Sequence, residues 1–202
     1  MSDERSAVGS PIGTRLRSAT RQQHAAVEGA LGFLVPGVQI AAYRAYLERW
    51  HGFYRVAEPR LDAWHVRERL LDWPPRRKLR LLAGDLGALG LGRGQLRRLP
   101  VCPDVPAVDD TATALGVLYV VEGSTLGGAV LRRRLAGGRI PDDAFGFLTS
   151  YGDDVGRRWR GYRAATARWV EEHPEQGDRV VAAARRTFEV LTRWTATAGS
   201  GP

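Results

Sequence analysis

Apolar side chains recur at spacings of three and four along most of this chain, whereas strict alternation of apolar and polar residues is scarce. The first spacing places side chains on one face of a helix, and the second is typical of a half-buried strand. With 202 residues and 44% hydrophobic content, the chain is long enough for one full core. The pattern predicts an all-α, single-domain, multi-helix protein. We expect a helical domain over residues 14–196, with flexible segments at 1–13 and 197–202.

Helix signals divide that domain into segments. Thr14 is a good N-cap for the first helix, Asp109 and Asp110 precede a long apolar helix, and Pro59 is expected to interrupt an aromatic one. The patterns predict helices over residues 14–30, 38–57 (resuming to 64), 74–89, 111–135, 153–172 and 174–194.

The chain is basic, with a formal net charge of +8 and a pI near 10.5. An anionic partner is therefore plausible on charge alone. Only one of the 30 basic residues is lysine, which indicates biased usage rather than selection of each arginine. No zinc-finger or recognition-helix pattern accompanies the basic runs, so we expect no nucleic-acid partner.

The sequence shows no targeting or membrane signal. Residues 1–13 are polar and contain Pro11, and charged residues interrupt each apolar segment before the roughly 18 uncharged residues needed to span a bilayer. The single cysteine, Cys102, has no disulfide partner. These features predict a cytoplasmic protein that does not contact a membrane.

A row of polar side chains runs along the first predicted helix. Arg17, Arg21, His24 and Glu28 follow one another at spacings of three and four, beside the apolar stripe. Such a row could hold a neutral imidazole under a metal, with Glu28 fixing its tautomer and two cations near an anionic ligand. An ordinary core histidine with a glutamate partner and surface arginines explains the same spacing.

Three glycines lie inside the apolar helix predicted over residues 111–135. Gly123, Gly127 and Gly128 each cost about 1 kcal/mol relative to alanine in a helix interior. Two gains could offset this cost: close packing of another helix, or a kink that brings bare backbone against a flat ligand. The sequence alone does not choose between them.

These two segments resemble a known family. Residues 16–28 resemble the first-helix signature of the heme oxygenases, and residues 119–128 (YVVEGSTLGG) are similar to their distal helix in its bacterial, biliverdin-producing form. The motifs occur in the family's order, about a hundred residues apart, and Phe147, Leu148 and residues 158–162 also look familial. The resemblance covers nearly the whole chain.

The resemblance implies a haem site with two sides. His24 becomes the proximal iron ligand and Glu28 its hydrogen-bond partner, while Arg17 and Arg21 occupy the positions that approach the haem propionates. A basic residue of the segment 158–163, best matched by Arg160, would approach a propionate from the other side.

On the distal side, the resemblance makes Gly123 and Gly127 the points where the helix crosses the porphyrin, with Gly128 beside them. Animal members place an aspartate directly after the first glycine, where it organises distal water, but this chain has Ser124, as bacterial relatives commonly do. Ser124 is thus a candidate catalytic residue, and the group that orders the waters stays open.

The implied reaction uses haem as both cofactor and substrate. Haem would be cleaved at a meso carbon to biliverdin, carbon monoxide and ferrous iron, with O2 and electrons from a separate ferredoxin or reductase. A functional link to a biliverdin-using phytochrome is a further expectation of this resemblance.

Two rival functions remain at this point. A haem-binding carrier or sensor would keep the pocket without turnover. A di-iron oxidase is suggested by Glu48-x-x-His51 and Asp62-x-x-His65, but on one continuous helix these pairs would lie about 21 Å apart. Only a break at Pro59 that folds the chain back would bring them together.

Overall fold

A computed structural model describes residues 11–30, 32 and 34–196, and all regular structure within these residues is helical. The predicted all-α fold is therefore confirmed. Residues 1–10 and 197–202 of the two terminal segments expected to be flexible lie outside the described residues. The α-helices are α2 (Ile12–Ala19), α3 (Arg21–Ala30), α4 (Ile40–Glu68), α5 (Leu79–Ala88), α6 (Arg93–Arg98), α7 (Thr111–Leu135), α8 (Val155–Glu172) and α9 (Gly177–Ala196). Short 3₁₀ turns are η1 (Pro74–Arg76), η2 (Asp142–Ala144), η3 (Gly152–Asp154) and η4 (Pro174–Gln176).

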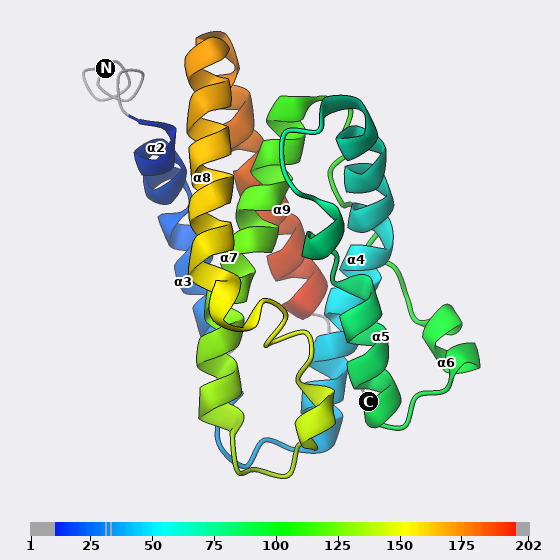
Figure 1. Cartoon of the computed structure of the whole chain (residues 1–202). Helices are drawn as coiled ribbons and strands as arrows, with labels where there is room; N and C mark the ends of the chain where they lie inside the picture. The colour runs from blue at the N-terminus through cyan, green and yellow to red at the C-terminus, as the bar shows by residue number, and fades with distance from the viewer. Residues whose placement is uncertain (1–10, 31, 33, 197–202) are drawn as a thin grey trace.

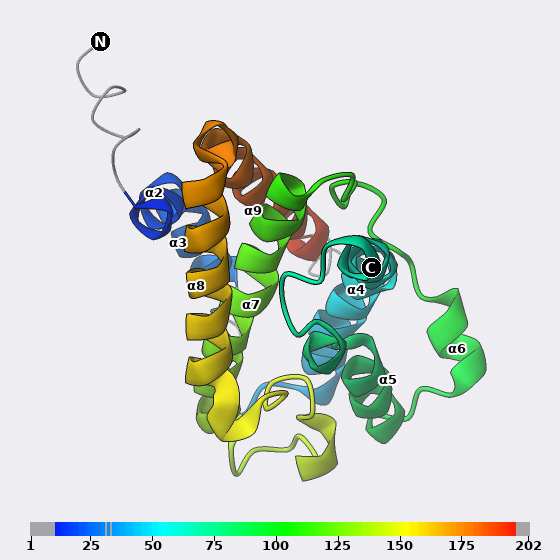
Figure 2. The same ribbon diagram turned by 45° about the horizontal axis from the view of Figure 1, so that its top comes forward.

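Helix α7 is the centre of the fold. It packs against both α8 and α9, and α3 also packs on α9 (Figure 1). Helices α4 and α5 pack together beside this group, and the short α6 lies at the outer edge in both views (Figure 2). The core side chains come from all of these layers, so the helices form one continuous hydrophobic cluster.

The sequence of α7 explains its position. The Asp110 carboxylate accepts a hydrogen bond of 2.8 Å from the Thr113 amide, which confirms the predicted cap, and the helix ends at Leu135 as expected. Among the described helices α7 is the one long and apolar enough to cross a membrane, but 67% of its most apolar window is buried inside the protein. We therefore interpret α7 as a core helix.

The first predicted helix differs from the expectation in two ways. It begins at Ile12 rather than Thr14, and it is interrupted at Thr20, so that it forms α2 and α3. The Thr20 hydroxyl donates to the Leu16 carbonyl over 2.7 Å, which is the local competition with helical hydrogen bonding that threonine introduces. The helical path resumes directly, because the His24 amide still donates to the Thr20 carbonyl.

The expected interruption at Pro59 is wrong. Helix α4 has 29 residues and continues without a break through Pro59. Its aromatic face is buried, as predicted. A proline removes one helical hydrogen bond, but the packing of this face outweighs that loss. Because α4 is continuous, the Glu48–His51 and Asp62–His65 pairs stay far apart. The described residues contain no group of three metal-ligating side chains, and the di-iron alternative has no structural support.

Close packing of α7 on α9 depends on a glycine that sequence reasoning missed. A Cβ added at Gly116 would lie 2.5 Å from the Ala183 Cβ and 2.7 Å from the Val180 carbonyl oxygen. Real Cβ atoms do not approach backbone so closely, so only glycine allows the two helices to meet here. The signal was present as a small residue opposite a run of alanines, but its partner lies almost 70 residues away.

We predict that Gly116→Ala lowers the free energy of unfolding by about 1–3 kcal/mol, because the added methyl group must separate α7 from α9. Gly84→Ala is the matched control, because nothing lies within 4 Å of its Cβ position in α5. The control should gain up to about 1 kcal/mol from helix propensity. Urea unfolding followed by circular dichroism measures both variants, and equal effects would contradict this account of the contact.

Candidate functional site

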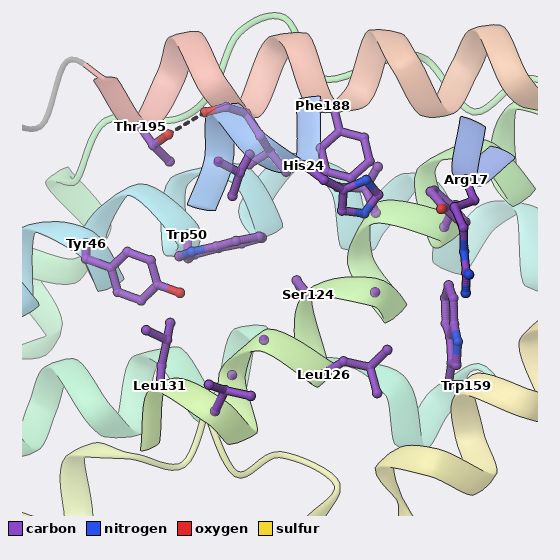
Figure 3. A pocket seen from close by; sticks show the side chains of 18 of the residues that line it. Arg17, His24, Tyr46, Trp50, Ser124, Leu126, Leu131, Trp159, Phe188 and Thr195 are labelled. Atoms are coloured by element: carbon purple, nitrogen blue, oxygen red, sulfur yellow. Dashed lines mark hydrogen bonds between the residues drawn. The ribbon is translucent and has the colours of Figure 1, made fainter. Parts of the chain in front are cut away.

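A pocket of about 800 Å³ opens between α2 and α3 on one side and α7 on the other, with α9 as its back wall. Figure 3 shows His24 and Phe188 on one side of this space and Ser124 and Leu126 on the opposite side. Its lining residues are Arg17, Arg21, His24, Val27, Tyr46, Trp50, Tyr119, Val120, Gly123, Ser124, Leu126, Gly127, Gly128, Val130, Leu131, Arg134, Trp159, Phe188, Leu191 and Thr195. The structure thus gathers most of the predicted site residues in one place.

The imidazole of His24 is held in a defined orientation. Its Nδ1 lies 2.9 Å from the Thr20 carbonyl oxygen, and because a carbonyl only accepts hydrogen bonds, Nδ1 must carry the proton. The ring packs against Phe188 with 4.6 Å between centroids. In the neutral ring Nε2 is then the nitrogen with the free lone pair, and it has no hydrogen-bond partner among the described residues. A neutral histidine with a fixed tautomer and a free Nε2 is what a metal-ligating imidazole requires.

The Thr20 carbonyl accepts the hydrogen bond from the His24 Nδ1. The side chain of Glu28, the partner of His24 that the sequence predicts, lies outside the described part of the structure. The Thr20 hydroxyl also lies 3.2 Å from Nδ1, and the residue is fully buried. The four-residue spacing of Thr20 and His24 was visible in the sequence, but a backbone carbonyl gives no sequence signal.

The opposite side of the pocket is formed by backbone. A Cβ added at Gly127 would meet nothing within 4 Å, and one at Gly123 would approach only the Trp159 ring, at 4.0 Å. These two glycines therefore leave open space over α7 rather than admit another helix. Gly128 also lines the pocket, but its Cβ direction faces the Leu148 carbonyl oxygen at 3.1 Å, so it lets the loop before η3 pack behind α7.

Two hydroxyls follow Gly123. Ser124 donates to the Val121 carbonyl over 2.8 Å, and Thr125 donates to the Glu122 carbonyl over 2.6 Å. Both bonds run back along the helix, which is the local role that short hydroxyl side chains often take in helices. The Ser124 oxygen keeps its lone pairs for a donor in the pocket.

Cationic side chains lie at the rim. Arg17 and Arg21 are exposed, line the pocket and have no ion pair with another described residue. Arg134 from the end of α7 also lines it and was missed by sequence reasoning. Arg160 lies in a neighbouring pocket of about 830 Å³, whose wall includes Arg17, Tyr119 and Trp159. The structure therefore does not bring Arg160 into the wall shared by the other predicted residues.

Comparison with known proteins identifies this arrangement. The heme oxygenase family model matches residues 10–197. The chain belongs to the heme oxygenase family. A heme oxygenase of Xanthomonas campestris pv. campestris (strain 8004) is 30% identical over 143 residues, which are 70% of this chain and 81% of that protein.

Two solved heme oxygenases share the fold. The structure of heme oxygenase from Leptospira interrogans matches with a TM-score of 0.76 at 16% identity, over 93% of this chain and all of that one. Heme oxygenase-1 from the cyanobacterium Synechocystis sp. PCC6803, solved in complex with heme, matches with a TM-score of 0.70 at 16% identity, over 93% and 92% of the two chains.

The residues of the pocket fit the haem expected in this family. Its volume is typical of a cofactor site, and its walls are largely apolar, including the aromatic rings of Tyr119, Trp159 and Phe188. Among the described residues, the imidazole Nε2 on one side and the two arginines at the rim have no partner, and glycine backbone forms the other side. These are the groups that an iron porphyrin with two carboxylates needs.

We predict that Gly127→Leu lowers haemin affinity at least roughly tenfold, because the side chain would fill the open space over α7. The haem-free variant should unfold no more easily than the wild type, because nothing lies within 4 Å of the new Cβ atom and helix propensity improves. Absorbance titration with haemin measures the affinity, and Gly84→Leu, in equally open space on α5, is the matched control. Unchanged haemin affinity in Gly127→Leu would contradict the proposed location of the site.

Proposed function

We propose that the protein binds haem between α3 and α7, with His24 as the axial ligand, and cleaves it oxidatively at a meso carbon. The products are biliverdin, carbon monoxide and ferrous iron. Haem supplies the oxygen-activating iron and is itself the molecule oxidised, so it is substrate as well as cofactor. Membership of the heme oxygenase family supports this proposal.

The proposal depends on one observation, the tautomer and orientation of the His24 imidazole. A hydrogen bond to the Thr20 carbonyl fixes the Nδ1–H tautomer, and Nε2 is free beside a pocket whose far side is bare glycine backbone. A neutral imidazole gives less electron push than a thiolate, which suits an oxygenase whose substrate is its own cofactor.

The remaining pocket residues orient the ring and exclude water. Arg17 and Arg21 would pair with the two propionates and so fix the rotation of the porphyrin in its plane. Leu126, Leu131 and the aromatic walls shield the space from solvent, while Gly123 and Gly127 bring α7 close enough to restrict how a small ligand tilts. Arg160 in the neighbouring pocket is a further propionate contact in this proposal.

Electrons must come from outside the chain, because the sequence has no flavin or nicotinamide motif. An acidic ferredoxin or reductase would complement the net charge of +8. The proposal includes a cytoplasmic location and, for the product, a biliverdin-using phytochrome as a receiving protein. Burial of the most apolar helix within the fold is consistent with that location.

One experiment tests the reaction. Haemin is added to purified protein, the visible spectrum is recorded, and ascorbate or a reductase system is then supplied under air. We expect the haem bands to be lost and verdohaem, then biliverdin, to form. Haemin binding without haem loss would support the carrier or sensor instead, an alternative favoured by Ser124, whose hydroxyl proton is engaged by the Val121 carbonyl.

His24→Ala should lose the axial-histidine spectrum and haem turnover, and added imidazole should restore the spectrum because the cavity left by the ring lies in the same pocket. Visible and resonance Raman spectra measure the ligand directly. Phe188→Leu, which changes the ring's neighbour without removing the ligand, is the control. A His24→Ala protein with a full-strength axial-histidine spectrum would refute the assignment.

The rim arginines give a separate prediction about affinity. Replacing both Arg17 and Arg21 with Glu should weaken haemin binding by roughly 10²-fold, because two propionate contacts become repulsive. Arg97→Glu with Arg98→Glu makes the same change in net charge on the distant α6 and should leave the affinity near that of the wild type. Titration at two salt concentrations separates direct pairing from the overall field, and equal weakening in both double variants would rule out the propionate role.

A further inference from the structure

A buried group of charged residues lies behind the pocket, on the far side of α7. Glu122, which directly precedes Gly123, is completely buried; its carboxylate accepts hydrogen bonds from Arg76 and, over 2.7 Å, from the Tyr151 hydroxyl. Lys78 is also completely buried, and its Nζ lies 3.2 Å from the centroid of the Tyr151 ring. That ammonium has no hydrogen-bond partner in the described part of the chain. The proposed reaction has so far used none of these groups.

Lys78 is the only lysine among the 30 basic residues of the chain. Elsewhere the chain uses arginine for every cation, yet at this one interior position it has a lysine. The two side chains differ in one relevant property: a guanidinium does not release its proton in a protein, whereas a buried amine does. Of the 30 lysine and arginine side chains, Lys78 is therefore the one that can become neutral.

The surroundings of Lys78 bring the pKa of its amine close to neutral pH. Burial lowers its pKa to about 7. Glu122 on α7 and Glu58 on α4 favour the ammonium, whereas Arg158 on α8 and Arg76 in η1 oppose it. For the carboxylate of Glu122 burial has the opposite effect and raises the pKa, whereas Arg76 and the hydrogen bond from Tyr151 lower it.

Tyr54 connects this group with the pocket. It lies one turn before Glu58 on α4, and its hydroxyl is buried without a hydrogen-bond partner among the described residues. Burial raises its pKa well above the ordinary value, the charges of Glu58 and Glu122 raise it further, and the neighbouring Ser124 lowers it. Tyr54 thus lies between the buried charges, which raise its pKa, and the pocket, because its ring packs 5.8 Å (centroid to centroid) from that of the pocket residue Trp50.

We propose that Lys78 is a positioning residue that holds an exchangeable proton behind α7 and, through Glu122 and Tyr54, controls the protonation of the pocket side at Ser124. The inference rests on the proposed function. When the ammonium gives its proton to the Glu122 carboxylate, Lys78 becomes a neutral amine and Glu122 a neutral acid, and a proton from solvent later restores the charged pair. Lys78 does not touch the ligand; it acts through its neighbours.

Because the chain has one lysine, NMR with ¹³C- and ¹⁵N-labelled lysine reports Lys78 alone. The full-length haem-free protein is titrated between pH 5 and pH 11. We expect a midpoint near 7, as against about 10.5 for an ordinary lysine. Glu122→Gln should lower the midpoint, because it removes a charge that favours the ammonium, and Arg158→Gln should raise it. A wild-type midpoint above 9, or shifts of the same sign in both variants, would overturn the proposal.

A second measurement tests the connection with the pocket. The pH midpoint of the visible spectrum of the haem-loaded ferric protein should shift by at least half a pH unit in Lys78→Met. In the wild type the rate of haem loss should fall as the pH rises through 7, because the ammonium is the form that holds the proton. Lys78→Arg keeps the charge but releases no proton, so it should be roughly tenfold slower and lose this pH dependence.

Arg77→Met is the control, because Arg77 adjoins Lys78 in the chain but is exposed and paired with Asp62. If Lys78→Arg and Lys78→Met keep the spectral midpoint and the pH profile of the wild type, the proposal is wrong even if haem is degraded. Haemin binding without haem loss would contradict the oxygenase assignment alone, because the lysine titration and the spectral midpoint still report Lys78.

Discussion

The contact between α7 and α9 at Gly116 determines where the pocket can be. The two helices meet there with no room for a side chain, and both then run toward the pocket. A few residues later α9 contributes Phe188, Leu191 and Thr195 to the pocket wall, and α7 contributes residues 119–131. Since α3 packs on α9, the His24 ring rests on Phe188 and faces the glycine surface of α7. One close approach thus sets the separation between the two sides of the site.

Local signals in the sequence were enough for much of this architecture. Asp110 and the apolar run after it placed α7 correctly at both ends, because a cap and a helical stripe are properties of neighbouring residues. The row of Arg17, Arg21 and His24 also faces one pocket, since the interruption at Thr20 leaves the helical path intact. The match to the family model confirms the family that these segments predicted, and the roles of the individual residues stay predictions.

The features that the sequence did not predict depend on contacts between segments that are far apart in the chain. Pro59 alone signals a helix break, but burial of the whole aromatic face of α4 keeps the helix continuous, and no local pattern reveals that burial. The partner of His24 proved to be a backbone carbonyl, which any residue could supply. Glu122 could not be assigned from sequence because Arg76 and Tyr151, its partners, come from other parts of the chain. The role of each glycine in α7 likewise depends on what lies opposite it: Gly116 faces α9, Gly128 faces the Leu148 backbone, and Gly127 faces open space.

Helix α7 also explains how an apolar pocket and a buried charge can lie at neighbouring residues of one helix. Successive residues on a helix turn by about 100°, so Glu122 and Gly123 face different surroundings although they are neighbours. Glu122 needs Arg76, Tyr151 and the ammonium of Lys78 because an unpaired carboxylate would not stay ionised inside the protein. Gly123 presents only backbone to the pocket, so α7 adds no charged side chain to the pocket wall at this position. The field of the buried charges acts across the backbone of α7, and Ser124 is the polar side chain that follows Gly123 on the pocket side.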